Sequence, residues 1–439
     1  MPEAPYQEEI QAAIVMLSTA VLKQKGSELL EDATHLDSEV RDILRIIGNG
    51  TVSQVWAALA NQVVEMEKKP GMTVQRSPAI TVTSLYGAVQ VPSPYLWSRE
   101  DKRGCRPVSD HLGLRHNGRT PAVERALTDF GAEESFGQAS RRFEEHYGFS
   151  IGRTTILRVV ERHAQRAERF VEARLAEART EYAQPPAQRP GVEQMEVQLD
   201  GSEIRTGILK PTDNGECSPV RQLPKRVREE AWREVRVGLT RPSEEIDATY
   251  VAKMGSYPEV VGQLFSAACL RGLSSRTKVV SVGDGGNGLK EELEAQFPGL
   301  RFILDRPHLK GHIFETADAC GLKDDERLHW VTRLMVLIDT GQVDTVLDEL
   351  RAHKGRGKKR VNRLLAHLTR FRSSMNYDAY REAGLPIGSG AVESAHRTIP
   401  QKRLKLPGAW WRPDNVNPML ALRVLRANGW WNELWQEAA

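Results

Sequence analysis

Apolar residues along this chain change their spacing several times, and each change predicts a different kind of element. Between positions 6 and 68 they recur every three or four residues, which predicts helices. Between positions 72 and 96 they alternate with polar residues around Tyr86-Gly87, which is typical of a β-hairpin. The helical spacing returns at Thr120 and continues to about Tyr182. The first part of the chain is therefore predicted to be mostly helical, with one small β-rich region.

A second pattern begins after a proline-rich stretch, 183–191, that reads as a linker. A strand is predicted at 192–199, followed by a polar loop rich in Arg and Lys. Further strands are predicted near residues 234, 249, 278 and 301, with helices before the last two of them. Three strands, a helix, a strand, a helix and a strand is the order of an RNase H-like α/β core. Polar helical spacing from 313 to about 380 predicts an insertion before the last helix of that core.

Two of the predicted helices between 119 and 182 have helix-turn-helix proportions, with Gly148 in the turn. A DNA-binding helix-turn-helix contacts bases and phosphates with residues near the start of its second helix. Those positions here are Arg153, Thr154, Thr155 and Arg158. An ordinary helical hairpin has the same pattern, so the DNA-binding interpretation depends on the rest of the chain.

The length of the chain indicates how many domains it forms, and the distribution of its charges indicates what it binds. A chain of 439 residues should form two or three domains. The formal net charge is only +3, but nine Lys/Arg and no acid fall between Arg351 and Arg372, and five more between Arg397 and Arg412. Basic stretches on a near-neutral protein indicate that a polyanion such as nucleic acid binds at those stretches. The alternative is that each stretch is the solvent-exposed face of a helix.

Cellular location and redox state follow from what the sequence lacks. No apolar run reaches membrane-spanning length and the N-terminus has no signal-peptide core, so we expect a cytoplasmic protein without membrane partners, associated with the nucleoid if it binds DNA. The four cysteines are scattered without a Cys-x-x-Cys pair, which excludes a zinc ribbon and indicates reduced thiols.

Three carboxylates stand where strand-like or turn-like segments end. Asp200 and Asp284 each close a predicted strand, and Glu393 follows a glycine-rich turn that should open a helix. Acids that follow strands of one sheet can meet at the same edge, where their like charges are unfavourable unless a cation lies between them. Carboxylate oxygens suit Mg²⁺ or Mn²⁺, and two such ions catalyse in-line displacement at a phosphodiester. We therefore predict a two-metal enzyme acting on nucleic acid, with Asp200, Asp284 and Glu393 as catalytic metal ligands.

A second glycine-rich turn, the one that contains Asp284, offers a competing interpretation. The segment from Gly283 to Gly288 matches the Gly-x-Gly-x-x-Gly fingerprint of dinucleotide-binding proteins, and Asp305 lies about twenty residues further on. Asp284, however, lies inside the turn that would hold a pyrophosphate, and its carboxylate would repel that ligand. Bound to Mg²⁺, the same carboxylate would attract a phosphate. We favour the metal site and keep a dinucleotide-dependent oxidoreductase as the alternative.

Two histidines follow Asp305 on a predicted helix. His308 and His312 are four residues apart, as in a zinc site, but Gly311 and the lack of a fourth ligand weaken that interpretation. We expect instead that His308 interacts with the Asp305 carboxylate and that the two residues pack beneath the metal site without binding the metal directly.

Basic and aromatic residues crowd the end of the chain. Arg397, one turn after Glu393, should share its helix face and hold a phosphate near the metals. Further DNA contacts are expected from Lys402, Arg403 and Lys405, beside Trp410 and Trp411, which could stack on a flipped or splayed base. For Trp430, Trp431 and Trp435 a place on the hydrophobic core is favoured.

Several short motifs, taken together, resemble one family. They are Gln198-Leu199-Asp200-Gly201, Val282-Gly283-Asp284-Gly285, Phe297-Pro298, Leu304-Asp305-Arg306-Pro307-His308 and Ile387-Gly388-Ser389-Gly390-Ala391-Val392-Glu393-Ser394, preceded by Thr120-Pro121 and Ser135-Phe136. Over most of residues 100–439 the chain resembles bacterial insertion-sequence transposases of the Kra type. These are DDE enzymes with an RNase H-like core, related to the Mutator superfamily.

The resemblance implies a metal-binding triad of Asp200, Asp284 and Glu393, with a helical insertion before the glutamate. Asp305 and His308 resemble the Cys/Asp-x-x-His element of relatives. Spacing leaves open whether Asp284 or Asp305 is the second acid, and Asp284 is favoured because it ends the strand after the first helix of the core. Relatives often carry paired cysteines after the N-terminal hairpin, whereas only Cys105 is found here.

The expected activity is that of a DNA transposase with two Mg²⁺ (or Mn²⁺) ions per site. It would bind terminal inverted repeats and target DNA as a homodimer or higher oligomer, cleave the element ends and join them to the target. The alternatives are a structure-specific nuclease of the same fold and a transposase-derived DNA-binding protein without catalysis.

The expected fold is α/β, an RNase H-like core with a mixed five-stranded sheet, flanking helices and a helical insertion, preceded by a mostly helical DNA-binding region with a small β-hairpin. The expected segments are a helical region (1–68), the hairpin and linker (69–118), a helix-turn-helix-like region (119–182), the Pro-rich linker (183–191), the first part of the core (192–312), the insertion (313–385) and the last part of the core with the basic, Trp-rich C-terminus (386–439).

Overall fold

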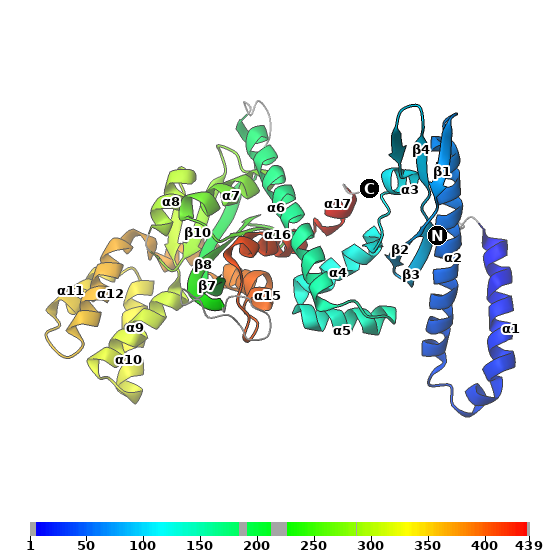
Figure 1. The fold of residues 1–439 in the computed structure, drawn as a ribbon. Coiled ribbons are helices and arrows are strands. Elements are labelled where there is room, and N and C mark those ends of the chain that lie inside the picture. The colour runs from blue at the N-terminus through cyan, green and yellow to red at the C-terminus, as the bar shows by residue number, and fades with distance from the viewer. Residues whose placement is uncertain (1–5, 184–190, 212–225, 287, 437–439) are drawn as a thin grey trace. The chain divides into compact units, whose positions relative to one another are not determined.

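The structure, a computed structural model, describes residues 6–183, 191–211, 226–286 and 288–436. Most of the predicted proline-rich linker therefore lies outside the described residues. The chain forms two compact units, which are described separately below (Figure 1). The first comprises Met1–Phe130 and Gly137–Arg153, and the second comprises Gly131–Phe136 and Thr154–Ala439.

The first unit begins with two long helices, α1 (Gln7–Glu31) and α2 (Leu36–Glu67), as the apolar spacing predicts. They are followed by two small sheets with strand orders β1-β4-β5 and β3-β2-β6. The strands are β1 (Met72–Arg76), β2 (Ala79–Ser84), β3 (Gly87–Pro92), β4 (Tyr95–Ser98), β5 (Arg103–Cys105) and β6 (Gly118–Arg119), with the short helix α3 (Pro107–Leu112) between the last two.

The hairpin predicted around Tyr86-Gly87 is confirmed, since β2 and β3 pair antiparallel from Ala79 opposite Pro92 to Ser84 opposite Gly87. Gly87 has a φ of 112°, which a residue with a side chain rarely adopts. The alternate, inward-facing residues of both strands pack against α2 and α3. This small core contains Ala60, Val64, Ile80, Val82, Val89, Val91, Leu96, Val108 and Leu114.

The two helices predicted to form a helix-turn-helix are α5 (Phe136–Tyr147) and α6 (Arg153–Ala183), and α4 (Pro121–Glu133) precedes them. Gly148 lies between α5 and α6 with a φ of 73°. Its N–H donates to the carbonyl of Glu144, which ends α5. The predicted turn position is therefore confirmed.

The second unit is built on a mixed five-stranded sheet in the order β11-β10-β7-β8-β9. Strand β10 runs parallel to both β7 and β11, whereas β8 runs antiparallel to β7 and β9. Helices α7 (Tyr257–Leu270), α8 (Leu289–Gln296) and α9 (Arg306–Cys320) follow the third, fourth and fifth strands in the chain. The strands are β7 (Gln194–Pro211), β8 (Arg226–Pro242), β9 (Thr249–Lys253), β10 (Lys278–Gly283) and β11 (Arg301–Leu304). The prediction of a mixed five-stranded sheet with flanking helices is confirmed.

Strand β10 lies inside the sheet, with β7 on one side and β11 on the other. Every residue after Lys278 in this strand is buried, without alternation. A strand with both faces covered is expected to show such a continuous apolar run. This burial explains why Val279-Val280-Ser281-Val282 is recognisable as a strand from its sequence.

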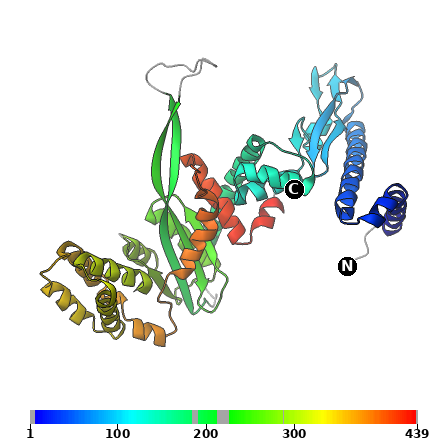
Figure 2. The ribbon, with the colours of Figure 1, turned by 90° about the horizontal axis from the view of Figure 1, so that it is seen from below.

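The sequence prediction is wrong about the polar loop after residue 199. Strand β7 continues to Pro211 and pairs with β8 without interruption as far as Arg226. Beyond residue 203, β8 is the one strand of the sheet that pairs with β7, apart from a parallel bridge between Thr206 and Trp411, so the two strands form an arm that extends from the sheet (Figure 2). Apart from the buried Ile204 and Thr206, most of the described side chains of β7 in the arm are polar or exposed, which conceals the strand periodicity.

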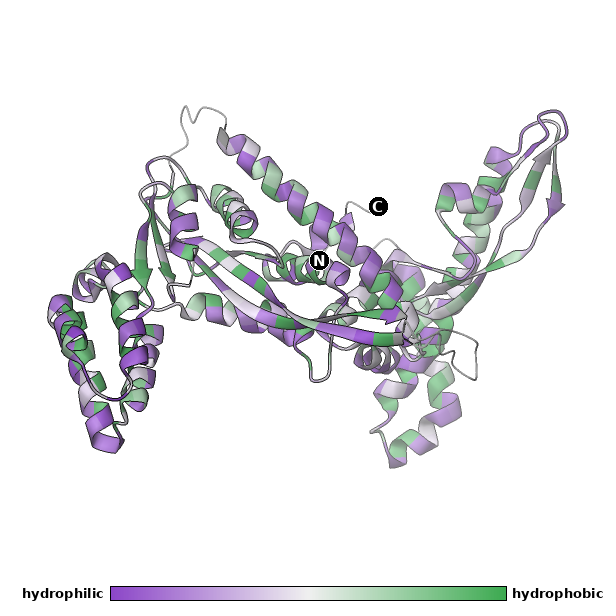
Figure 3. Ribbon diagram, turned by 60° about the vertical axis from the view of Figure 1, so that its left-hand side comes forward, coloured by the Kyte–Doolittle hydropathy of each residue, from purple (hydrophilic) through white to green (hydrophobic). Residues whose placement is uncertain are grey.

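The helices predicted between residue 313 and about residue 380 are confirmed; whether they are an insertion stays a prediction. This segment contains α10 (Asp324–Asp339), α11 (Val343–Ala352), α12 (Lys358–Arg370) and α13 (Tyr377–Glu382), with a 3₁₀ turn at Arg372–Ser374. Among the described helices, none combines the length and the apolar content needed to cross a bilayer. Figure 3 shows hydrophilic and hydrophobic residues mixed along most of the helices.

The chain after the insertion begins with α14 (Gly390–His396) and continues as a π-helical turn (Arg397–Gln401) into α15 (Lys402–Leu404). Pro400 lies inside this turn, and its lack of an N–H interrupts α-helical hydrogen bonding. A 3₁₀ turn (Pro413–Asn415), α16 (Val416–Ala427) and α17 (Trp431–Gln436) complete the unit. Trp430 and Trp431 are buried, as predicted.

Candidate metal centre

Three acids lie level with one another across three neighbouring strands. Strands β7 and β10 pair in constant register, and their last pair is Val197 opposite Ser281. Three residues beyond this pair, the same register sets Asp200 opposite Asp284. Strands β10 and β11 pair up to Gly283 opposite Leu304, so the next position on each brings Asp284 beside Asp305. Because the three strands are parallel, the acids gather at one edge of the sheet.

Asp305 is the most buried of the three, with no exposed surface. Its Oδ1 accepts the backbone N–H of His308 at 2.7 Å, which caps α9, and its Oδ2 accepts the backbone N–H of Ser389 at 2.6 Å. Its own N–H donates to the carbonyl of Gly283. Burial opposes ionisation, but the hydrogen bonds from His308 and Ser389 outweigh it and lower the pKa of Asp305 to about 2.

His308 stands beside Asp305 at the start of α9, with Nδ1 3.2 Å from Oδ1 of the carboxylate. This hydrogen bond raises the pKa of His308 to about 9 against the opposing effect of burial. The charges of Asp284 and Glu393 add to the rise. In the absence of a metal ion, His308 is therefore a cation among carboxylates at neutral pH.

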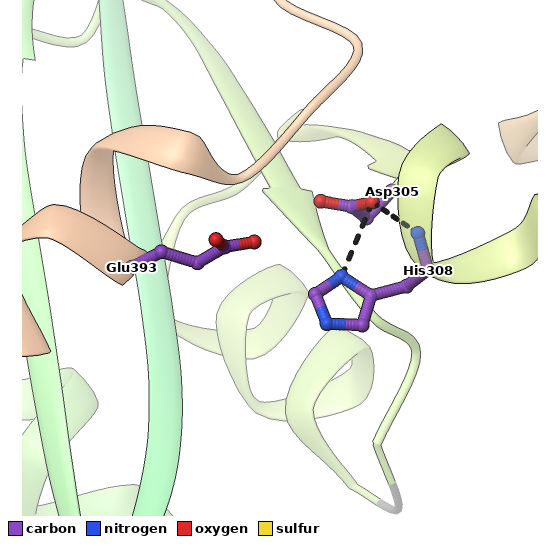
Figure 4. Close-up of side chains that lie close together, drawn as sticks. All are labelled: Asp305, His308 and Glu393. Carbon is purple, nitrogen blue, oxygen red and sulfur yellow. Dashed lines mark hydrogen bonds and ion pairs between the residues drawn. The ribbon is translucent and has the colours of Figure 1, made fainter. Parts of the chain in front are cut away.

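Glu393 comes from α14 and points toward His308 and Asp305 (Figure 4). One potential ligand atom from each of these three residues lies within 4.8 Å of the others. Among the described residues, this is the one group of three or more acids, histidines or cysteines with such spacing. The group can contribute carboxylate oxygens and an imidazole nitrogen to a cation.

Two hydrogen bonds position the helix that carries Glu393. The Asp305 carboxylate holds the N–H of Ser389, and Oε1 of Gln198 accepts the N–H of Val392 at 3.0 Å. Gln198 is buried in β7, two residues before Asp200. The start of α14 is thereby fastened to both β7 and the end of β11, which places Glu393 at the same edge as the three aspartates.

Asp200 is partly exposed and interacts with a buried histidine that the sequence analysis missed. Its Oδ2 lies 3.5 Å from Nε2 of His396, and its Oδ1 accepts the N–H of Gly201 at 2.7 Å. Burial raises the pKa of Asp200; His396 and the Gly201 N–H oppose this rise, and the charge of Asp284 adds to it. Burial lowers the pKa of His396. The sequence signal that could have indicated His396 is its position one helical turn after Glu393.

Asp284 lies in the turn after β10, where its Oδ1 accepts the N–H of Gly286 at 2.8 Å. Its charge also raises the pKa values of Asp200 and His308, which indicates that the acids act on one another electrostatically. Gly285 has a φ of 79°, and a Cβ at this position would lie 2.7 Å from Cε2 of Phe371. The glycine therefore allows the residue after α12 to pack directly on the turn that carries Asp284.

A cavity of about 150 Å³ lies between α9 and α12. The His312 and His367 rings are in edge contact with centroids 5.3 Å apart, and burial lowers the pKa of His367 to about 4, with His312 adding to the effect. The lining residues are His312, Thr316, Arg360, Arg363, Leu364 and His367. The zinc site considered for His308 and His312 does not appear among the candidate groups of the described residues.

The structure thus brings the predicted ligands Asp200, Asp284 and Glu393 to one edge, together with Asp305 and His308. The tightest group, however, contains Asp305, His308 and Glu393 rather than the predicted triad. Asp200 and Asp284 each direct one oxygen to the N–H of a neighbouring glycine.

The residues predicted to contact DNA have different environments. At the start of α6, Arg153, Thr154 and Arg158 are exposed and Thr155 is partly buried. Arg397, Lys402 and Lys405 are exposed, and Lys402 forms an ion pair with Glu133 at 2.6 Å. Arg403, by contrast, is buried inside the second unit.

Comparison with known proteins gives no family for this chain. No family model matches it, and no curated protein matches it either.

Proposed function

We propose that this chain is a DDE-type DNA transposase, which binds element ends and carries out metal-dependent strand cleavage and strand transfer. The observation that carries the proposal is the level alignment of Asp200, Asp284 and Asp305 at one sheet edge, with Glu393 brought to the same edge by a later helix. Acids arranged in this way suit divalent cations bound to a phosphodiester.

The arrangement of the second unit supports an RNase H-like core. Its first three strands are antiparallel neighbours, and its fourth and fifth strands lie parallel to the first on the other side. A helical insertion separates the fifth strand from the helix with the last acid. This order is the one expected from the resemblance to insertion-sequence transposases of the Kra type.

The donor set fits a metal of the Mg²⁺ or Mn²⁺ kind. Burial and the charge of Asp284 raise the pKa of Asp200, as expected for carboxylates gathered without a cation. Two bound ions would lower the pKa of a water or a DNA 3′-hydroxyl and stabilise the leaving oxygen. We assign Asp200, Asp284 and Glu393 as their ligands.

Asp305 and His308 receive a supporting role in this proposal. Both oxygens of Asp305 already accept hydrogen bonds that position α9 and α14. Asp305 therefore keeps Glu393 in place, and Asp284 is preferred as the second acid. His308, whose Nδ1 is paired with Asp305, balances the negative charge of the cluster.

The proposed partners are the element ends and the target DNA. The basic stretch from 351 to 372 belongs to the helical insertion, where several of its cations pair with acids of neighbouring helices. Lys354, Arg356, Lys358 and Lys359 are exposed. A cluster of exposed cations in the domain that precedes Glu393 suits a DNA backbone.

A second copy of the chain is the proposed partner of α1. From Ile10 to Leu22 this helix has no charged residue, and none of its side chains is buried in the first unit. Most residues of this stretch are apolar, and in proteins most of the stability of a helix comes from packing its apolar side chains against a partner. Its acids Glu8 and Glu9 precede the uncharged stretch, and Lys23 and Lys25 follow it.

This charge pattern favours an antiparallel pair of α1 helices. Centred on Met16, the pair would set Ile10 against Leu22 and Glu9 against Lys23 of the second copy, twice by symmetry. A dimer held in this way could bind two element ends together.

The dinucleotide alternative is disfavoured by packing at the glycine-rich turn. The space where a side chain of Gly285 would lie is filled by Phe371 and His367. The close approach of a backbone to a pyrophosphate, which the glycines of the fingerprint permit, is thus blocked at that residue.

The test is cleavage of labelled DNA that carries the ends of any element flanking the gene, with Mg²⁺, Mn²⁺ or EDTA. We expect metal-dependent nicking and joining, lost in Asp284→Asn and Asp200→Asn. The matched control is Asp378→Asn, an exposed aspartate of α13, which should remain active. Cleavage without joining would identify a structure-specific nuclease, and binding without cleavage in any metal would identify a non-catalytic DNA-binding protein.

A further inference from the structure

Buried polar side chains connect β7 and β8 to the helix that carries Glu393. Glu196, Gln198 and Asp200 alternate along β7, so their side chains point to the same face of the sheet, against which α14 packs. Only 4% of Glu196 and 1% of Gln198 is exposed. Polar groups buried to this extent are unfavourable unless they find hydrogen-bond partners, so the partners of these two side chains are informative.

Glu196 is held by Arg241, which lies directly opposite it on β8. Nε and Nη2 of Arg241 lie 2.9 and 2.8 Å from Oε2 of Glu196. The other oxygen, Oε1, accepts a hydrogen bond from Nε2 of Gln198. Each oxygen of this buried carboxylate therefore has a partner, and a cation balances its charge.

Gln198 connects this ion pair to α14. Its Oε1 accepts the N–H of Val392 at 3.0 Å. Val392 is the third residue of α14, a position at which the backbone N–H has no acceptor within the helix. Ser389 precedes the helix but makes no capping bond with its side chain. Gln198 therefore caps α14 from a separate strand, at the residue before Glu393.

The Glu196 carboxylate determines which way the Gln198 amide faces. A carboxylate only accepts hydrogen bonds, and a backbone N–H only donates. Between Glu196 and Val392 the amide therefore has one favourable orientation, with its NH₂ group toward the acid and its oxygen toward the helix. If the group at position 196 could also donate, the amide could turn over, and its NH₂ group would then face the Val392 N–H, which leaves that donor without an acceptor.

We propose that Glu196 is a positioning residue of the metal centre. Held by Arg241, it orients the Gln198 amide, and that amide holds the helical turn from which Glu393 reaches the cation. Glu196 is not offered as a ligand: it acts through Gln198, as the hydrogen-bond partners behind metal ligands set the geometry of a site. The proposal rests on the proposed function, because it takes Glu393 as a metal ligand.

The test measures the dissociation constant for Mn²⁺ of the full chain without DNA, from the electron paramagnetic resonance signal of free Mn²⁺. Glu196→Gln allows the amide at position 198 to turn over, and Gln198→Met removes that amide. We expect each variant to bind Mn²⁺ about tenfold more weakly, as is usual when a partner behind a metal ligand is lost.

A reciprocal exchange separates the orientation of the amide from packing alone. In the double variant Glu196→Gln/Gln198→Glu, the new carboxylate at position 198 can accept from the Val392 N–H and from the new amide at position 196. The oxygen of that new amide can accept from Arg241. The double variant has the net charge of the parent and restores every hydrogen bond, so it should bind Mn²⁺ as tightly as the parent.

The matched control is Val251→Ala, which removes part of a buried side chain from β9, an edge strand of the same sheet. It should lower the urea midpoint of unfolding because it leaves a cavity, but it should keep the Mn²⁺ affinity of the parent. The urea midpoint of every variant is measured beside its Mn²⁺ affinity, so that a loss of stability is told apart from a displaced ligand.

Unchanged Mn²⁺ affinity in Glu196→Gln, or no recovery in the double variant, would overturn the proposal. If Glu196→Gln does not fold, Gln198→Met and the double variant carry the test, and equal affinity in these two would overturn it. If the parent still cleaves DNA in either case, the proposed function stands and the positioning role alone is wrong. The expected affinities without any DNA cleavage would support the positioning role and remove the transposase, whereas a parent that binds no Mn²⁺ would overturn both.

Discussion

The Asp305 carboxylate accepts a hydrogen bond from the backbone N–H of Ser389 at 2.6 Å, although 84 residues separate the two in sequence. Its other oxygen caps α9. One buried side chain therefore joins the end of the sheet, the start of the insertion and the helix with Glu393. This relationship explains how a long helical insertion can be accommodated without displacing the last acid.

Replacing Asp305 by Asn should destabilise the protein and misplace Glu393. The amide has one oxygen where two are needed, and it lacks the charge that strengthens both hydrogen bonds. We expect a loss of about 2 kcal/mol in the free energy of unfolding, as for other hydrogen bonds to charged groups. Urea denaturation measures this loss. The exposed Asp378→Asn should change stability by less than about 0.5 kcal/mol; an equal loss in both variants would contradict a special role for Asp305.

Two glycine substitutions should act in opposite directions. In Gly285→Ala, the Cβ would meet Phe371 and the φ of 79° is strained, so we expect a loss of about 1–3 kcal/mol. In Gly311→Ala, inside α9, nothing lies within 4 Å of the new Cβ, and alanine should add about 0.5–1 kcal/mol. Thermal unfolding of the two variants side by side checks both signs. A Gly285→Ala variant as stable as the parent would show that the turn and Phe371 do not pack as described.

The buried histidine His367 should make the protein less stable in mild acid. Burial lowers its pKa to about 4 from an ordinary value of about 6.5. Between these values the unfolded chain binds a proton that the folded chain does not, so falling pH favours unfolding over this window. Below about pH 4 both states are protonated and the loss stops.

The measurement is the free energy of unfolding at a series of pH values for the parent and for His367→Gln. Between about pH 6.5 and pH 4, the free energy of unfolding should fall less in the variant than in the parent. His329→Gln, an exposed histidine of α10, serves as the matched control. Parallel pH profiles for the parent and His367→Gln would contradict the prediction.

A charge placed in the uncharged stretch of α1 should break the proposed dimer. Ile14, 50% exposed in the single chain, would be buried between two copies. We expect Ile14→Glu to convert a dimer into a monomer in light scattering after gel filtration. Val336→Glu replaces an equally exposed apolar residue of α10 and should leave the dimer intact. A parent protein that is monomeric at all concentrations would instead indicate that α1 is covered by its own chain.

Local patterns predicted most of the elements because side-chain periodicity follows directly from strand and helix geometry. The apolar run before Asp284, the alternation in β2 and β3, and the polar helices of the insertion were all recognisable. The strand character of residues 201–210 was not, because only Ile204, Thr206 and Gly207 are buried in that part of β7, which are too few to impose an apolar alternation.

The sequence by itself determined that acids close successive strands, since this depends only on which residues follow each apolar run. Only the tertiary structure decided that Asp200, Asp284 and Asp305 lie level, because strand register is set by pairing between distant segments. It also decided that His396 pairs with Asp200, and that Arg403 is buried rather than exposed like its basic neighbours. The Arg403 charge is buried by aromatic rings such as that of Phe136, and these rings come from distant parts of the sequence that meet only in the folded chain.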